Sequence, residues 1–177
     1  MNTKLNIVLC LSLTLAVLAP LRAQSRIFLE PYFGYENGSF TQENKDDAKG
    51  LNYGIRLGYG PQRIALGYEL SLSHLEVEAE PGTISDYKIK DQGVFLLYRL
   101  QFGNLWGSYI FQSESRERVG DLLEGKAYRL GFGLRVFGKA NLNVEKLTRE
   151  YNKLNQSQLD STFKVETFIL SLGVPIP

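Results

Sequence analysis

The sequence predicts an all-β fold in which eight antiparallel strands run up and down to form a closed barrel. Three observations predict it. Large apolar residues alternate with small or polar ones through most of the chain after residue 23, which is the period of a strand with one apolar face. The polar stretches that separate these alternating segments are short and long by turns along the chain, so that each short stretch is followed by a long one. No stretch after residue 23 holds the ~18 consecutive apolar residues of a transmembrane helix.

Residues 1–23 have a different pattern from the rest of the chain. A lysine near the start is followed by an apolar run over about residues 5–19 and by the small residue Ala23. This order is typical of a secretory signal peptide cleaved after Ala23, so that residues 24–177 form the barrel domain. The alternative, an uncleaved membrane anchor, would need ~20 apolar residues, which is more than this run contains. Cleavage removes Cys10, the only cysteine, so we expect no disulfide in the exported domain.

Eight alternating segments are the predicted strands. They cover about residues 26–37, 50–60, 63–77, 86–101, 104–115, 124–137, 140–151 and 161–174. The second is the clearest, since over residues 51–59 every odd position is large and apolar or aromatic and every even position is polar or glycine. The third repeats the pattern over residues 64–72, and the sixth over residues 128–136. The same alternation defines the first, fourth and eighth.

The fifth and seventh segments are the least regular. In the fifth, Leu105 and Tyr109 compete with Trp106 and Ile110 for the apolar face. The seventh begins by alternating and then becomes charged. Its apolar spacing over residues 144–158 also fits a helix, which is the local alternative.

The connections between these strands alternate in length. Short turns punctuated by glycine or proline lie at residues 60–62, 102–103 and 138–139. Longer polar stretches are the predicted outer loops, at about residues 37–50, 78–86, 114–124 and 152–161. In an up-and-down meander this puts all short turns at one end and all long loops at the other, as in the β-barrels of outer membranes. The loops would make the surface contacts of the protein.

The two faces of the strands predict which side of the barrel meets lipid. The polar face is rich in glycine, alanine and serine, which suit the crowded interior of an eight-stranded barrel. The apolar face would then meet hydrocarbon, where only a closed barrel satisfies the backbone hydrogen bonds of strands. Charged residues share the inward phase, and we expect them to pair into a network that plugs the lumen. They are Glu30, Arg56, Glu69, Arg99, Arg129 and Arg135, with Glu145 as a further candidate.

Aromatic residues toward the strand ends predict two interfacial girdles, because a ring with a polar group is stable at the boundary between lipid and water. Beside the short turns lie Tyr59, Phe102, Trp106 and Phe137. Toward the long loops lie Tyr35, Tyr53, Tyr87, Tyr128 and Phe163. Ordinary core packing in a soluble β-domain is the alternative explanation of these rings.

Three strand motifs combine glycine with aromatic residues: LGYG at 57–60, LGYE at 66–69 and LGFG at 130–133. Together with the export signal and the eight alternating strands, they make the chain similar to the small OmpA/OmpX-type outer-membrane β-barrel family, within the porin-like barrel superfamily. The resemblance implies a monomeric bacterial outer-membrane protein with a structural or surface-interaction role. Its implied partners are outer-membrane lipid, lipopolysaccharide and the barrel-assembly machinery. One departure is that Pro177 ends the chain, where such barrels usually end in an aromatic residue.

The residue inventory gives little support to a catalytic or cofactor-dependent function. A formal charge of +1 does not favour nucleic acid. One histidine and one cysteine are too few for a metal site of those ligands, so we expect neither a metal nor another cofactor.

Two alternative functions remain. Ser73, His74 and Glu76 are the residue types of an acyl-transfer triad, and the resemblance to small outer-membrane barrels then implies a lipid A deacylase or acyltransferase as the enzymatic alternative. Adjacent residues of a strand point to opposite faces, however, so Ser73 and His74 would not meet and we expect no catalysis. The other alternative is a soluble lipocalin-like ligand-binding barrel, which would be apolar inside and polar outside.

Overall fold

The computed structural model describes residues 26–41, 45–80, 83–117, 120–136 and 140–176. The predicted signal peptide and Phe137 lie outside the described residues. Among the residues inside these ranges, no helix is both long enough and apolar enough to cross a membrane.

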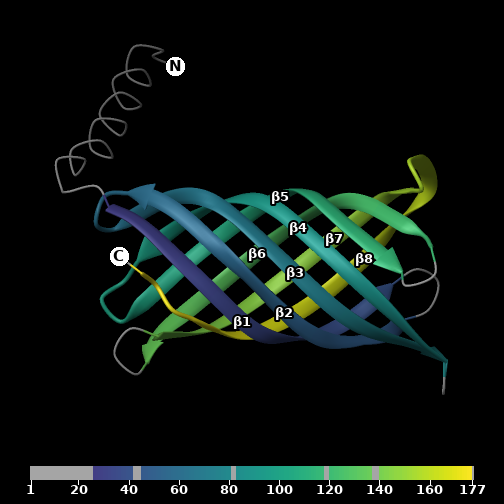
Figure 1. Cartoon of the computed structure of the whole chain (residues 1–177), viewed down its shortest axis with the longest axis horizontal. Helices are drawn as coiled ribbons and strands as arrows, with labels where there is room; N and C mark the ends of the chain where they lie inside the picture. The colour runs from purple at the N-terminus through teal and green to yellow at the C-terminus, as the bar shows by residue number, and fades with distance from the viewer. Residues whose placement is uncertain (1–25, 42–44, 81–82, 118–119, 137–139, 177) are drawn as a thin grey trace, which may run out of the picture.

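Eight strands pair antiparallel in the order of the sequence, and β8 pairs with β1 to close the barrel. Their bounds are β1 (Arg26–Thr41), β2 (Lys45–Gly60), β3 (Ile64–Glu80), β4 (Thr83–Arg99), β5 (Gly103–Glu117), β6 (Leu122–Val136), β7 (Ala140–Leu154) and β8 (Ser157–Gly173). Figure 1 shows the strands tilted along the barrel, with the chain beyond β8 at the same end as the start of β1. We call this the turn end and the opposite end the loop end. The structure confirms the predicted all-β, eight-stranded antiparallel barrel.

The strands are longer than predicted toward the loop end. Most of the predicted first loop, residues 37–50, is paired backbone, because β1 and β2 stay in register up to Thr41 and Lys45. The other three predicted loops are shortened in the same way. The predicted loop boundaries were wrong because most outward side chains of these extensions are polar, which hides the alternation. Several inward side chains, Phe40, Ala48 and Leu123, are still apolar and buried.

Residues 144–154, for which a helix was the alternative, belong to strand β7, which pairs with β6 on one side and β8 on the other. Leu147 and Tyr151 are buried inside the barrel, whereas Val144 is exposed on the outer face. The helix-like spacing therefore combined apolar residues from both faces of one strand. Pairing on both sides satisfies the backbone hydrogen bonds of β7 and of the edges of β6 and β8 that face it. A helix in place of β7 would leave those two edges without partners.

The outer surface of the barrel carries a belt of exposed apolar side chains on all eight strands. Members of this apolar belt include Phe33, Leu57, Leu66, Leu96, Leu105, Leu130, Val144 and Leu170. Inward positions of the same strands hold the buried polar and charged residues, together with apolar side chains at both ends of the lumen. The outer face is therefore apolar where the lipocalin-like alternative requires a polar one, and an apolar outer face is what a barrel in lipid requires.

The lumen is filled with side chains along its length. The turn-end layer consists of Phe28, Ala65, Phe95, Leu97 and Trp106. The loop-end layer consists of Phe40, Ala48, Leu75, Val77, Ile89, Leu123, Tyr151 and Val165. A smaller apolar cluster lies between them on one side, made of Ile110, Ala127, Leu147 and Ile169. The rest of the middle of the lumen is polar and charged.

Candidate functional site

A buried ionic network occupies the lumen between the turn-end and loop-end layers. It comprises Arg56, Arg129, Arg149, Glu30, Glu36, Glu69, Asp91 and Glu145. All eight residues are at most 1% exposed. Their charges therefore have almost no water to solvate them, and each depends on the partners that the barrel brings to it.

Arg56 on β2 joins carboxylates from three other strands. Its Nη2 lies 2.8 Å from Glu145 Oε2, its Nε lies 3.3 Å from Glu69 Oε2, and its Nη1 lies 3.7 Å from Glu30 Oε2. The guanidinium also stacks on two rings, at 4.2 Å from the centroid of Tyr32 and 4.4 Å from that of Trp106. A planar group with donors at its edge and aromatic rings on its faces is well suited to a site without water.

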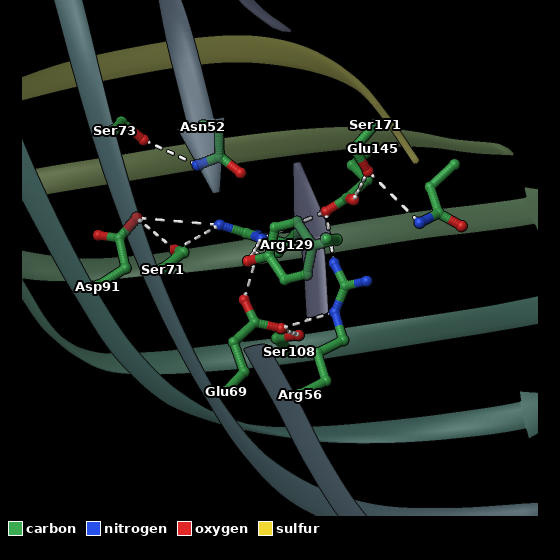
Figure 2. A network of polar contacts seen from close by, with 12 residues as sticks. Asn52, Arg56, Glu69, Ser71, Ser73, Asp91, Ser108, Arg129, Glu145 and Ser171 are labelled. Atoms are coloured by element: carbon green, nitrogen blue, oxygen red, sulfur yellow. Dashed lines mark hydrogen bonds and ion pairs between the residues drawn. The ribbon is translucent and has the colours of Figure 1, made fainter. Parts of the chain in front are cut away.

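Arg129 on β6 shares two of these carboxylates. Figure 2 shows it at the centre of the network, between Asp91 and Ser71 on one side and Glu145 on the other. Its Nη1 lies 3.2 Å from Glu69 Oε1 and 3.3 Å from Glu145 Oε2, while its Nη2 donates to Ser71 Oγ at 2.9 Å. Arg56 and Arg129 therefore form one cluster held together by Glu69 and Glu145.

Arg149 on β7 forms the part of the network nearest the loop end. It pairs with Glu36 through Nη1 and with Asp91 Oδ2 through Nη2 at 2.9 Å. Ser73 Oγ accepts from its Nη2 at 2.9 Å, and Thr167 Oγ1 donates to Glu36 at 2.6 Å. Asp91 also lies 3.9 Å from Arg129 Nη2, so it links this part to the central cluster.

The network has more acids than bases, with five carboxylates and three guanidinium groups. Neutral side chains donate further hydrogen bonds to the carboxylates. Ser108 donates to Glu69 at 2.9 Å, Ser113 to Asp91 at 2.6 Å, Ser171 to Glu145 at 3.0 Å and Asn141 to Glu30 at 3.1 Å. The small polar residues of the inward face therefore act as donors as well as leaving space for the arginines.

The structure brings together Glu30, Arg56, Glu69, Arg129 and Glu145 from the predicted set, but not Arg99 and Arg135. Arg99 is half-buried at the turn end, where its Nη1 donates to the carbonyls of Pro61 and Gln62 at 3.2 Å each. Arg135 is exposed. Both were wrongly placed in the network because they have the inward phase but lie at the last or next-to-last position of a strand. Phase gives the face of a side chain and not its depth along the barrel axis.

Three network members, Glu36, Asp91 and Arg149, were not predicted. The signal for all three was the phase itself, because Glu36 has the inward phase of Glu30, Asp91 that of Arg99 and Arg149 that of Glu145. Glu36 adjoined a predicted loop, however, and Arg149 belonged to a run of charged residues, so neither was assigned to an inward strand position.

The predicted interfacial aromatic residues fall on both sides of the wall. Tyr35, Tyr53, Tyr59 and Tyr128 are exposed on the outer face. Trp106 is not interfacial: it is 2% exposed and lies inside the barrel. The fifth strand takes the phase that points Trp106 inward, because its indole ring covers the position opposite, where Gly131 has no side chain.

Ser73 and His74, the residues of the enzymatic alternative, lie on opposite faces of β3. Ser73 Oγ is inside the network, where it donates to Glu36 Oε2 at 2.7 Å and accepts from Asn52 Nδ2 at 2.8 Å. His74 is outside, stacked on Tyr53 with a distance of 3.3 Å between Nε2 and the tyrosine hydroxyl. The barrel wall therefore separates the two residues.

Comparison with known proteins identifies the fold. No protein-family model matches the chain, and no curated protein matches it in sequence. Among solved structures, Ail of Yersinia pestis in complex with the heparin analogue sucrose octasulfate is similar, with a TM-score of 0.59, 15% identity, and coverage of 85% of this chain and 99% of that one. Neisserial surface protein A is similar with a TM-score of 0.54 and 16% identity, over 86% of this chain and 98% of that one. The outer membrane protein Ail in a phospholipid bilayer nanodisc gives a TM-score of 0.52 and 12% identity, over 85% and 100%. At this level of identity the likeness shows the fold alone, and the chain has the fold of the small eight-stranded outer-membrane β-barrels.

Proposed function

We propose that the chain is a monomeric bacterial outer-membrane protein with a structural or surface-interaction role and a lumen that conducts no solutes. The apolar belt around a closed barrel supports the membrane location, because it would otherwise expose large apolar side chains to water on every strand. The partners in this proposal are the lipids of the membrane, including lipopolysaccharide, and the assembly machinery that would insert the barrel.

The filling of the lumen is the observation that carries the closed-channel proposal. Apolar side chains occupy the turn end and the loop end, and the buried ionic network lies between them. Arg56, Arg129 and Arg149 are each 0% exposed, which a hydrated pore along the axis would not allow. Catalysis is not part of the proposal, because the wall of the barrel separates Ser73 from His74.

We expect purified protein refolded into a planar lipid bilayer to give no stable conductance steps above the baseline. A general-diffusion porin prepared in the same detergent serves as the positive control for insertion. Large and long-lived open-channel currents from the pure protein would contradict the closed lumen.

The membrane location has a separate test. The expressed chain should fractionate with outer membranes and change its mobility on gels after heating, as folded barrels do when they unfold. Recovery from the soluble periplasmic fraction without detergent would contradict the proposal.

A further inference from the structure

Two hollows adjoin one another on the outer face of the barrel. The hollow nearer the loop end has a volume of about 690 Å³, and its outward-pointing lining includes Tyr35, Lys49, Leu51, His74, Glu76, Asp86, Lys88 and Arg116. The hollow nearer the turn end has a volume of about 310 Å³, and its outward-pointing lining is Tyr53, Ile55, Leu70, Leu72 and Lys90. The first is mostly charged and the second mostly apolar.

The strand register places the two hollows on consecutive rows of the sheet. In one row, His74 on β3 faces Lys88 on β4, and Lys88 faces Arg116 on β5. In the next row toward the turn end, Leu72 faces Lys90. Tyr53 lines the apolar hollow and stacks on His74, which lines the charged one, with ring centroids 6.0 Å apart. The Tyr53–His74 pair is therefore the border between the two hollows.

Lys88 and Arg116 form an unusual pair for a sheet surface. Like charges directly opposite on neighbouring strands destabilise the sheet. Among the described residues, no ion pair joins either side chain to a carboxylate within 4.0 Å. Lys164 on β8 shows the ordinary arrangement, because its Nζ donates to Glu166 Oε1 at 2.7 Å.

The carboxylates of the charged hollow do not separate these cations from the apolar belt. Glu76 and Asp86 face each other one row beyond His74 and Lys88, on the side toward the loop end. Lys88 and Arg116 thus lie between an acidic row and the apolar hollow. A ligand that approaches from the lipid side would meet the two cations before it meets Glu76 and Asp86. Glu114, which faces Lys90 in the row nearer the turn end, accepts a hydrogen bond from Gln112 Nε2 at 2.6 Å.

We propose that this face of β2–β5 binds one acylated, phosphorylated membrane lipid. Its phosphate group contacts Lys88 and Arg116, and one acyl chain occupies the hollow beside Ile55, Leu70 and Leu72. Arginine and lysine are suited to a phosphate, since the first offers a planar pair of donors and the second a compact positive charge. The apolar hollow is continuous with the belt, so the remaining chains of the lipid stay in the bilayer. This inference rests on the proposed membrane location.

The test measures binding of purified lipid A to the folded full-length barrel in detergent micelles by native mass spectrometry. The wild-type protein should retain one lipid A molecule. The double variant Lys88→Ala/Arg116→Ala should bind at least about tenfold more weakly, because it loses two charged contacts to phosphate. The variant Leu70→Trp, which fills the apolar hollow and leaves both cations in place, should also bind more weakly.

A matched control removes two exposed lysines from another face. The double variant Lys126→Ala/Lys164→Ala lowers the net charge by the same amount, so it should bind lipid A as the wild type does. Equal loss in both double variants would overturn the site in favour of a general charge effect. If millimolar inorganic phosphate displaced lipid A and Leu70→Trp had no effect on binding, the site would bind a simple anion, and the proposal of a lipid ligand would be wrong. If wild type binds no lipid A but still fractionates with outer membranes, this inference fails and the proposed function stands.

Discussion

Replacing Arg56 with methionine is expected to lower the free energy of unfolding by about 3–5 kcal/mol. Methionine fills most of the same space but leaves the carboxylates of Glu30, Glu69 and Glu145 without the guanidinium that contacts all three. The network already has five carboxylates for three arginines, so two arginines would then face five acids in a site that excludes water. The measurement is urea unfolding in detergent micelles, with the heat-dependent gel shift as a check that the variant folds.

The control for this variant is Arg135→Met. Arg135 was predicted from its phase to belong to the network, but it is exposed at the turn end. Its replacement is expected to change the free energy of unfolding by no more than about 0.5 kcal/mol. Adding Glu145→Gln to Arg56→Met should recover part of the loss, because the amide keeps a polar partner there while one unpaired charge is removed. Equal stability of Arg56→Met and Arg135→Met would show that the network does not stabilise the barrel.

Replacing Gly131 with valine is expected to destabilise the barrel by about 3 kcal/mol, at the upper end of the usual cost of overpacking. A Cβ atom at this position would lie 2.3 Å from Cε2 and Cζ2 of Trp106. The indole has little room to move, because it is buried and its face carries the guanidinium of Arg56 at 4.4 Å. The folded yield and the urea midpoint of the refolded protein are the measurements.

The matched control is Gly107→Val on the neighbouring strand. Gly107 has the outward phase, and a Cβ atom there would meet nothing nearer than Leu130 Cδ2 at 3.3 Å. This variant should fold with near wild-type stability. In the Gly131→Val background, the further change Trp106→Leu should restore folding, since the smaller side chain leaves space for the valine. No rescue by Trp106→Leu would mean that the indole is not what excludes a side chain at Gly131.

The fifth strand shows one limit of prediction from sequence, because the sequence did not decide which of its two faces points into the barrel. Leu105 and Trp106 are both large and apolar, so local alternation gave two possible phases. A register shift between Ile110 and Ser113 also interrupts the alternation, which leaves Phe111 and Gln112 both exposed. The phase was decided by the fit of Trp106 over Gly131, and these residues meet only when β5 pairs with β6.

The strand ends show a second limit. The outward side chains of a strand are apolar only within the apolar belt. Beyond it, β1 and β2 continue with polar residues outside and with Phe40 and Ala48 inside. Phe40, Ala48 and Leu123 of the loop-end layer lie in such extensions, whereas the other members of the layer lie within the predicted strands.

The sequence alone determined the number of strands, their order, the apolar outer face and most of the inward charges, because a period of two residues is written into each strand locally. The tertiary structure decided the depth of each inward side chain and the partners that it meets. Glu36 and Arg149 are 113 residues apart in the chain and become hydrogen-bonded only after β8 closes the barrel onto β1. Closure and register set these distances, and neither is encoded in the spacing of residues along one strand.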